Sequence, residues 1–210
     1  MDSAQEKKNY MQECNGVLRS LKAANRKPKL LLHVCCAPCS SAVLLKLKEF
    51  FQISLFYYNP NIAPADEYRK REIELQKLVS FYKNDFNFNC EILSCEYNHE
   101  AFLHTVVGFE NEPEGGARCQ RCHQLRLKKT AEYATQNGFH YFCSTLSISP
   151  HKNAPLINEL GFSLETENCR WLPNDFKKEN GYLLSCRLSK QYGLYRQDFC
   201  GCEFSQKKAD

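Results

Sequence analysis

Seven of the 13 cysteines in this chain of 210 residues fall into three clusters. They are Cys35, Cys36 and Cys39, then Cys119 and Cys122, then Cys200 and Cys202. Thiols of cytosolic proteins stay reduced, so these spacings indicate metal or redox chemistry rather than a disulfide framework. Because about 80 residues separate one cluster from the next, only tertiary folding can unite them. We therefore predict an active-site centre and not a compact zinc ribbon.

The first cluster favours metal ligation over simple thiol exchange. Cys36 and Cys39 have the C-x-x-C spacing of a redox pair, but a third thiol, Cys35, adjoins them. Cys39 is expected near a helix N-terminus, where the helix dipole and free backbone N–H groups favour the thiolate. Adjacent cysteines point in different directions, so Cys35 and Cys36 could ligate two different metal centres, or one could ligate while the other packs in the core.

The other two clusters are ambiguous when taken alone. Cys119 and Cys122 form a second C-x-x-C, which suits a structural zinc site, an iron-sulfur cluster or a disulfide, with His123 as an optional ligand. Cys200 and Cys202 could complete a metal site, relay electrons as a thiol pair, or form a strained and therefore easily reduced disulfide.

Seven clustered thiols exceed the four that one cubane cluster or one tetrahedral zinc ion needs. The surplus permits a [4Fe-4S] cluster beside a mononuclear metal with an open position, which would couple electron delivery to Lewis-acid activation. The other six cysteines stand alone in sequence, and we expect inert side chains there. They are Cys14, Cys90, Cys95, Cys143, Cys169 and Cys186.

Hydrophobic periodicity predicts the alternating strands and helices that must position these thiols. A buried strand is expected at residues 30–34 and a helix at 38–51. Further helices are predicted at 10–25, 65–82, 98–107 and 121–136, and further strands at 53–57, 90–93 and 140–143. This alternation is typical of α/β proteins with a Rossmann-like open, mostly parallel sheet flanked by helices.

The loops at the carboxyl ends of parallel strands share one rim, where ligands bind. Residues 35–39 follow the first strand and residues 58–62 follow the second, so both loops are expected at that rim. We predict a single domain over residues 1–210. Its α/β core would span residues 30–145, and an irregular, mainly helical C-terminal cap at 146–205 would contribute to the active site.

Composition excludes some classes of protein and permits others. The hydrophobic fraction of 43% and the charged fraction of 25% are those of a globular domain. The mean hydropathy of −0.54 excludes a membrane span, and the polar N-terminus lacks the apolar core of a secretion signal, so we expect a cytoplasmic protein. Residues 117–210 hold 14 Lys and Arg against 9 Asp and Glu, an excess that permits a polyanionic partner such as RNA.

The stretch Leu32–Ser40 resembles the opening signature of the QueH-type, cobalamin-independent epoxyqueuosine reductases. The resemblance extends from about Leu30 to Cys202. It is carried by residues 58–62 with Glu67 and Tyr68, 118–122 with Arg126 and Leu127, 145–150 with Lys152 and Asn153, 175–178, and 189–202.

The resemblance implies a two-electron reduction of the epoxide in epoxyqueuosine, at the wobble position of the tRNAs for Asp, Asn, His and Tyr, giving queuosine and water. It also implies a [4Fe-4S] cluster beside a mononuclear metal, iron or zinc, with no cobalamin and no bound flavin. Electrons would come from an external low-potential donor of the ferredoxin or flavodoxin type. Some relatives carry Asp where this chain has Cys39, so the ligand softness and the identity of the second metal could differ.

Carried over by the same resemblance, the expected cluster ligands are Cys36, Cys119, Cys122 and one further thiol, with Cys202 as the candidate. Cys35 and Cys39 would hold the second metal, and Cys200 and Cys202 could complete either centre or act as a redox disulfide. The predicted catalytic residues are Cys35, Cys39, Asp175 and Tyr58, and Lys152 and His33 are further candidate proton sources, although a histidine that closes an apolar strand is more often a core residue. The predicted substrate-binding residues are Asn59, Asn61, Tyr68, Lys152, Asn153 and Arg196.

Three other functions compete with this interpretation. An ATP-using, iron-sulfur thiolase of tRNA would need a Gly/Ser-rich phosphate-binding loop after the first strand, where this chain has Cys35–Ser40. A zinc-stabilised RNA-binding module would use the thiols only to hold its fold, and it would be colourless where an iron-sulfur protein is brown. A thiol-disulfide oxidoreductase using Cys36 and Cys39 would need no metal.

Overall fold

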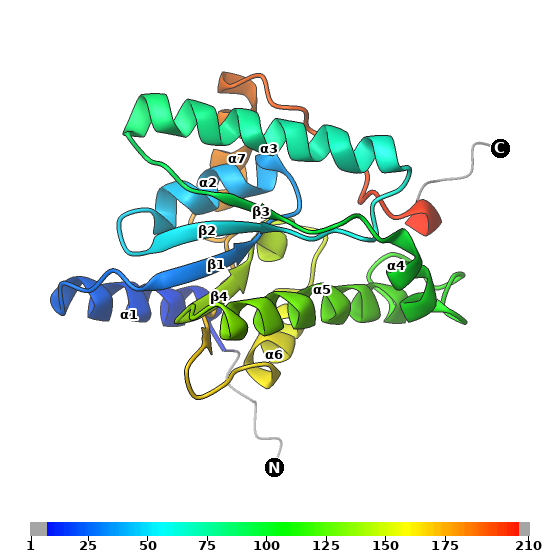
Figure 1. The fold of residues 1–210 in the computed structure, drawn as a ribbon, viewed down its shortest axis with the longest axis horizontal. Helices are drawn as coiled ribbons and strands as arrows, with labels where there is room; N and C mark the ends of the chain where they lie inside the picture. Colours follow the sequence, from blue (N-terminus) through cyan, green and yellow to red (C-terminus); the bar gives the residue numbers. More distant parts are fainter. Residues whose placement is uncertain (1–7, 206–210) are drawn as a thin grey trace, which may run out of the picture.

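The chain forms a five-stranded, all-parallel sheet with helices on both faces (Figure 1). This architecture comes from a computed structural model that describes residues 8–205. The strands lie in the order β3-β2-β1-β4-β5. They are β1 (Lys29–His33), β2 (Gln52–Tyr57), β3 (Ile92–Ser94), β4 (Tyr141–Ser144) and β5 (Arg170–Trp171). The predicted open parallel α/β fold is confirmed.

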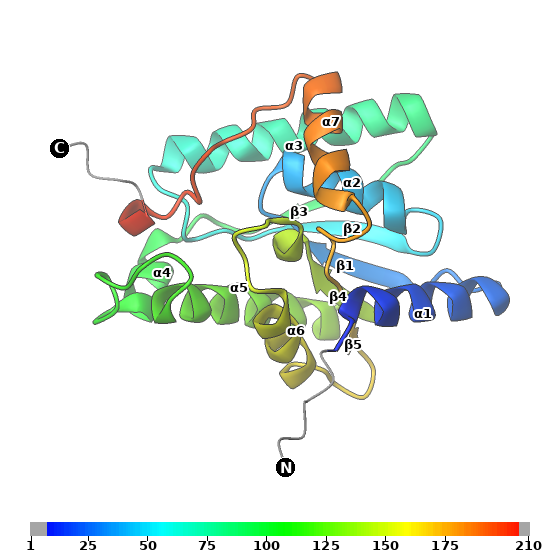
Figure 2. The ribbon, with the colours of Figure 1, turned by 180° about the vertical axis from the view of Figure 1, so that it is seen from behind.

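The helices form one layer on each face of the sheet. The α-helices are α1 (Tyr10–Ala23), α2 (Ala37–Leu47), α3 (Ala65–Phe86), α4 (His99–Val106), α5 (Ala117–Gln136), α6 (Ala154–Ser163) and α7 (Gly181–Gln191). Two short 3-10 helices are η1 (Thr145–Ile148) and η2 (Glu203–Ser205). Figures 1 and 2 place α2, α3 and α7 on one side of the sheet and α5 and α6 on the other.

The centre of the sheet is also the point at which its strand order reverses. β1 pairs with β2 on one side and with β4 on the other, and Leu30, Leu31 and Leu32 are fully buried. A strand covered on both faces reads as a continuous apolar run, which is why the sequence identifies it. Open α/β sheets bind ligands outside the carboxyl ends of the strands at such a reversal. A ligand site is therefore expected at the loops that follow β1 and β4.

One strand of the sheet, β5, is absent from the sequence prediction. It has only two residues and lies in the region expected to form an irregular cap. Its position depends on tertiary contacts, because the Trp171 indole N–H donates to Asn158 Oδ1 at 2.9 Å and the ring packs against Gly161 of α6. Hydrophobic periodicity has no signal for so short a strand.

Replacing Gly161 by alanine is expected to destabilise the fold by about 1–3 kcal/mol, because the new methyl group would meet the Trp171 ring at 2.1 Å. Gly16→Ala on α1 is the matched control, since the nearest atom to its added methyl group would be 3.9 Å away, and alanine in a helix is favoured by up to about 1 kcal/mol. Urea denaturation of both variants measures the difference. Equal stabilities would contradict the packing described for β5.

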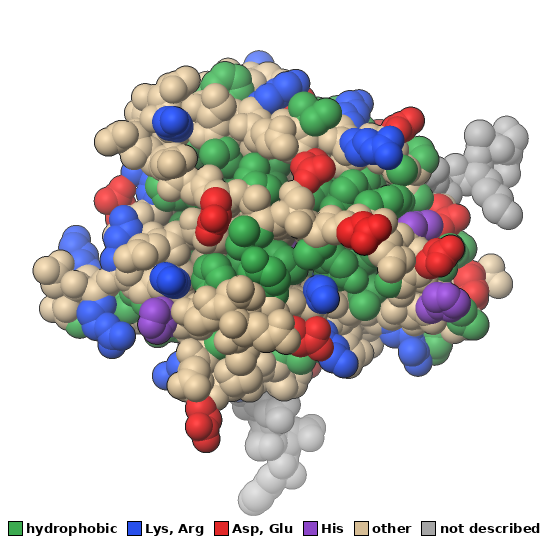
Figure 3. Space-filling model, in the orientation of Figure 1, with side chains coloured by type: hydrophobic (Ala, Val, Ile, Leu, Met, Phe, Trp, Pro, Cys, Tyr) green, Lys and Arg blue, Asp and Glu red, His purple; other side chains and the backbone are tan. Residues whose placement is uncertain are grey.

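The edge of the sheet at β3 is partly uncovered. Figure 3 shows hydrophobic side chains gathered between α3 and α5, where β3 ends the strand order, and Ile92 and Leu93 are half-buried there.

None of the helices within residues 8–205 combines the length and the apolar character needed to cross a membrane.

Candidate active site

Three thiols converge at the carboxyl end of β1. Cys35 follows the strand, Cys36 is the N-cap residue of α2, and Cys39 lies in the first turn of that helix. Their sulfur atoms all lie within 4.8 Å of one another, a spacing that no other trio of metal-ligating side chains in residues 8–205 meets. Thr145, which follows β4, places its Oγ1 3.7 Å from Cys35 Sγ. These three thiols, the β1 trio, therefore occupy the strand-order reversal.

One thiolate is favoured within the β1 trio. Hydrogen bonds with the Cys36 and Cys39 thiols hold the pKa of Cys35 well below its ordinary value, and the positive charges of Lys152 and Arg126 act in the same direction. The hydrogen bonds that Cys36 and Cys39 make with Cys35 favour their protonated forms, which raises the pKa of Cys36 to about 12 and raises that of Cys39. The group thus holds a single negative charge readily, whereas further ionisation requires a cation.

Four further thiols form a second group, from two distant parts of the chain. Cys119 and Cys122 lie in the first two turns of α5, and Cys200 and Cys202 come from the segment after α7. Cys122 and Cys202 are buried in one apolar cluster, against which Cys200 packs. Burial is the main cause that raises the pKa of Cys122 to about 12 and that of Cys202 to about 11. We call these four thiols the α5 quartet.

The start of α5 differs from the prediction, which began this helix at residue 121. The helix begins at Ala117, whose backbone N–H donates to Glu112 Oε2 at 3.3 Å, and the Arg118 guanidinium binds the carbonyl oxygens of Glu110 and Glu112. The glycine-bearing segment before the helix lacks a Ser, Thr or Asp cap, so its sequence gives no start signal. Cys119 therefore lies inside the first helical turn, and its sulfur accepts a hydrogen bond from Gly115 N–H at 3.2 Å.

Two cations lie between the thiol groups. Arg126 follows Cys122 by one helical turn and is 2% exposed. Burial alone would lower its pKa, but interactions with the ionised forms of Cys122, Cys35 and Cys200 raise it. Lys152 behaves in the same way, because Cys200, Cys35 and Cys39 outweigh its desolvation. Each cation thus responds to thiols of both groups.

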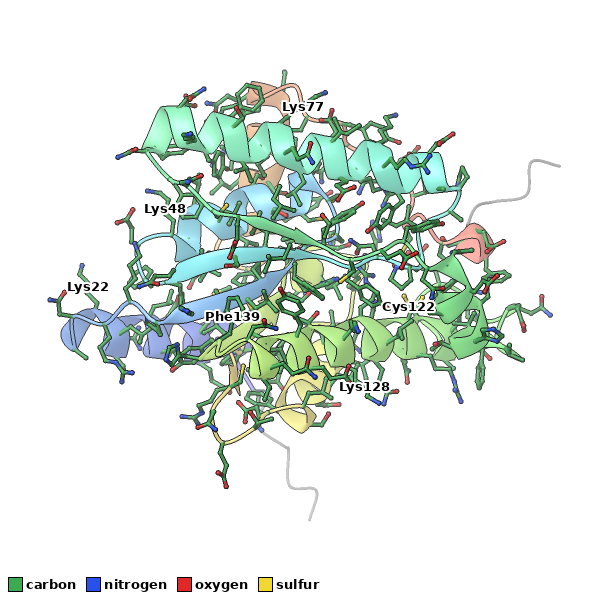
Figure 4. The ribbon with its side chains drawn as sticks, in the orientation of Figure 1. Lys22, Lys48, Lys77, Cys122, Lys128 and Phe139 are labelled. Carbon is green, nitrogen blue, oxygen red and sulfur yellow. The ribbon has the colours of Figure 1, made fainter. Side chains whose placement is uncertain are left out.

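A cavity of about 520 Å³ extends from the β1 trio to Cys200 of the α5 quartet. The β1 trio and Cys200 line it, together with Arg126, Lys152 and Arg71. Figure 4 shows Cys122 on the side of α5 that faces the sheet, whereas Lys128 projects away from it. Cys200 is thus the thiol of the quartet that faces the same cavity as the trio.

Three of the six predicted substrate-binding residues line this cavity. They are Asn61, Lys152 and Arg196. Asn61 is 1% exposed and its Oδ1 has no hydrogen-bond partner in the described part of the chain. Arg196 is exposed at the rim, and its guanidinium carbon lies 5.3 Å from the centre of the Tyr182 ring.

The other three predicted substrate-binding residues do not line the cavity, and their side chains make hydrogen bonds within the fold. The Asn59 amide donates to the Val34 carbonyl at 2.9 Å and accepts from Arg126 Nη2 at 2.6 Å, so it fastens α5 to the end of β1. Tyr68 is buried and its hydroxyl donates to the Cys95 carbonyl. Asn153 caps α6 by accepting from Leu156 N–H.

Two of the predicted catalytic residues lie outside the β1 trio and the lining of its cavity. Asp175 is buried and pairs with Lys177 at 2.6 Å, and Tyr58, whose pKa is raised by burial, packs beside Phe56. Neither residue is part of the cavity lining. The other two, Cys35 and Cys39, belong to the β1 trio.

His33, a candidate proton source, is a core residue. It is fully buried and hydrogen-bonded to Ser144 Oγ at 2.7 Å and to the Tyr58 carbonyl at 3.1 Å. Burial, reinforced by the Arg126 charge, lowers its pKa to about 3. An uncharged imidazole at neutral pH with both ring nitrogens engaged is a structural group and a poor proton donor.

Cys36 lies nearest to the other two thiols of the trio. By resemblance it is expected to ligate a cluster with Cys119 and Cys122, and its sulfur lies within 4.8 Å of those of Cys35 and Cys39. Thiolates are soft ligands suited to zinc and to iron-sulfur chemistry. Three thiols that open onto a cavity, with four more beside it, form a donor set that fits bound metal.

Similarity to known proteins gives independent evidence of the family to which the chain is related. A family profile described as Epoxyqueuosine reductase QueH matches residues 30–208. The chain is 39% identical to a protein of that name from Streptococcus pyogenes serotype M1, over 96% of this chain and 80% of the relative. It is 37% identical to one from Staphylococcus epidermidis, over 97% and 87%, and 34% identical to one from Thermotoga maritima, over 84% and 89%.

Proposed function

Because the chain belongs to the epoxyqueuosine reductase QueH family and is an oxidoreductase, we propose that it reduces epoxyqueuosine in tRNA to queuosine. Two electrons and two protons enter the epoxide. Both carbon–oxygen bonds break, a carbon–carbon double bond forms, and the oxygen leaves as water. The observation that carries this proposal is the cavity at the reversal of the sheet, which the β1 trio, Cys200 of the quartet and the cations Arg126 and Lys152 line together.

The two thiol groups suit two different metal centres. The compact β1 trio matches the needs of one ion, and the α5 quartet, which does not meet the same close spacing, suits a larger [4Fe-4S] cluster. When bound, the cluster would supply electrons one at a time and the single ion would act as a Lewis acid toward an oxygen. Electrons would reach the cluster from a low-potential donor of the ferredoxin or flavodoxin type.

The cations of the cavity serve the reaction through charge and proton supply. Arg126 is fixed by Asn59 and offsets the negative charge of the Cys35 thiolate. Lys152 lines the cavity beside Cys35 and Cys39 and holds a proton on Nζ. We assign Lys152 the donation of a proton to the departing oxygen, since it is the flexible donor of the two.

The test of the proposed function is a single-turnover assay. Anaerobically reconstituted protein is mixed with tRNA that contains epoxyqueuosine and a low-potential reductant, and the digested nucleosides are analysed by mass spectrometry. Conversion to queuosine that is abolished by Cys119→Ala supports both the reaction and its dependence on the quartet. No conversion by protein with an intact cluster would reject the epoxide as the substrate.

Arg196 is expected to contribute affinity for the tRNA and little to the chemical step. Arg196→Ala should raise KM for tRNA about tenfold with kcat nearly unchanged, and it should reduce the salt slope of binding by about one. Arg19→Ala, an exposed arginine on α1, is the control. A fall in kcat with an unchanged KM would contradict this role.

A further inference from the structure

The segment after α7, residues 194–202, crosses the molecule to deliver Cys200 and Cys202 to α5. In Figures 1 and 2 it leaves α7, runs beside α3 and reaches η2 near α4. The segment has no helix or strand of its own before η2, so side chains of other elements must fix its path. We call residues 194–202 the C-terminal segment.

One face of α3 carries those side chains. Glu67, Arg71 and Glu74 follow one another at intervals of four and three residues and so share a face. Glu74 Oε2 accepts from Tyr195 N–H at 2.9 Å, and Glu67 Oε2 accepts from the Tyr195 hydroxyl at 3.2 Å. The start of the C-terminal segment is thereby fixed to α3.

Arg71 holds the end of the segment. Its Nη1 donates to the Cys200 carbonyl at 3.0 Å, and its Nε donates to Glu67 Oε1 at 2.7 Å. The guanidinium carbon lies 5.1 Å from the centre of the Phe199 ring. With 2% of its surface exposed, the side chain has a fixed position, and its planar fork meets two partners at once.

Gly201 is shaped to this arginine. Its φ of +95° is one that L side chains rarely adopt, and an added Cβ would lie 3.0 Å from both terminal nitrogens of Arg71. The Gly201 carbonyl also accepts from Ala63 N–H at 2.9 Å. The turn between the two cysteines is therefore held by contacts with Arg71 and with Ala63, which precedes α3.

We propose that Arg71 is a positioning residue, which acts through the Cys200 carbonyl and Gly201 to hold Cys200 and Cys202 against Cys119 and Cys122. That the four thiols bind a catalytic cofactor rests on the proposed function. The positioning of the thiols by Arg71 does not depend on the proposed function. Arg71 also has an unpaired, buried Nη2 and lines the cavity, so its charge remains next to the site.

The test measures each thiol separately in the full chain after metal removal under reducing conditions. Alkylation by iodoacetamide is followed residue by residue with mass spectrometry, with and without Cd²⁺ as the probe. In the unaltered protein Cd²⁺ should protect all four thiols of the quartet together. In Arg71→Met, protection of Cys200 and Cys202 should require about 10- to 100-fold more Cd²⁺, while protection of the β1 trio is unchanged.

Arg69→Met is the matched control, because Arg69 lies on the same helix but is 72% exposed. If Arg71→Met does not fold, because the largely buried Glu67 carboxylate loses its ion-pair partner and keeps only the Tyr195 hydroxyl, the double variant Arg71→Met with Glu67→Gln replaces it. Protection of Cys200 and Cys202 equal to that in Arg69→Met would overturn the proposal.

The contact with Gly201 is tested by non-additivity. Gly201→Ala should weaken Cd²⁺ protection of Cys200 and Cys202 more than Gly193→Ala does, because Gly193 also has a positive φ but an added Cβ there meets nothing within 4 Å. In the Arg71→Met background the effect of Gly201→Ala should shrink, since the guanidinium is gone. An equal effect in both backgrounds would refute the contact.

These measurements need neither tRNA nor turnover, so they separate the two proposals. Altered protection in Arg71→Met, alongside no conversion of epoxyqueuosine by the unaltered protein, would leave the positioning role standing and reject the proposed function. Conversion by the unaltered protein, alongside unaltered protection in Arg71→Met, would support the proposed function and reject the positioning role of Arg71.

Discussion

Cys36→Ala is expected to lower single-turnover formation of queuosine at least about 100-fold and to lower the bound metal with it. Loss of groups that merely orient metal ligands costs roughly 10- to 100-fold in affinity or activity, so loss of a central thiol of the β1 trio should cost no less. Metal analysis and the nucleoside assay, run on the same sample, measure both effects.

Cys186→Ala is the control for that variant, since this thiol is half-buried on α7 and stands outside both groups. Cys39→Asp supplies a second comparison. It keeps an anionic ligand of harder character and should therefore retain conversion while shifting the preferred metal toward harder ions. Full turnover and full metal content in Cys36→Ala would show that the trio holds no catalytic metal.

The sequence predicts the first half of this site well because its residues are close in sequence. Leu30–Leu32 read as a buried strand, and the cysteines that follow must then lie at the carboxyl rim, next to a helix N-terminus. Strand, loop and helix are local features, and a parallel sheet converts them directly into positions in space.

The grouping of the thiols depends on contacts that no local pattern records. Cys200 joins Cys122 only because the C-terminal segment crosses α3, and that path is set by hydrogen bonds from Arg71 and to Glu74. Each of these contacts spans more than 120 residues in sequence. The quartet was therefore beyond the reach of spacing arguments.

Helix spacing in the sequence locates one of the cations near the thiols, Arg126, but does not single out another, Arg71. Arg126 follows Cys122 by four residues on a predicted helix, so it must lie on the same face. Arg71 follows Glu67 in the same way, but such pairs are common on solvated helix surfaces. Only burial, which the sequence does not display, distinguishes this pair from an exposed one.

Lys152→Met is expected to lower kcat about 10²- to 10⁴-fold, the range for loss of a positioned proton donor. Lys152→Arg should recover KM for tRNA but not kcat, because a guanidinium keeps the charge and does not give up its proton. Lys128→Met, on the exposed side of α5 (Figure 4), is the control. Single-turnover rates at saturating tRNA separate kcat from binding. If Lys152→Arg turns over as fast as the unaltered protein, Lys152 serves through charge alone and the proton must come from another group or from water.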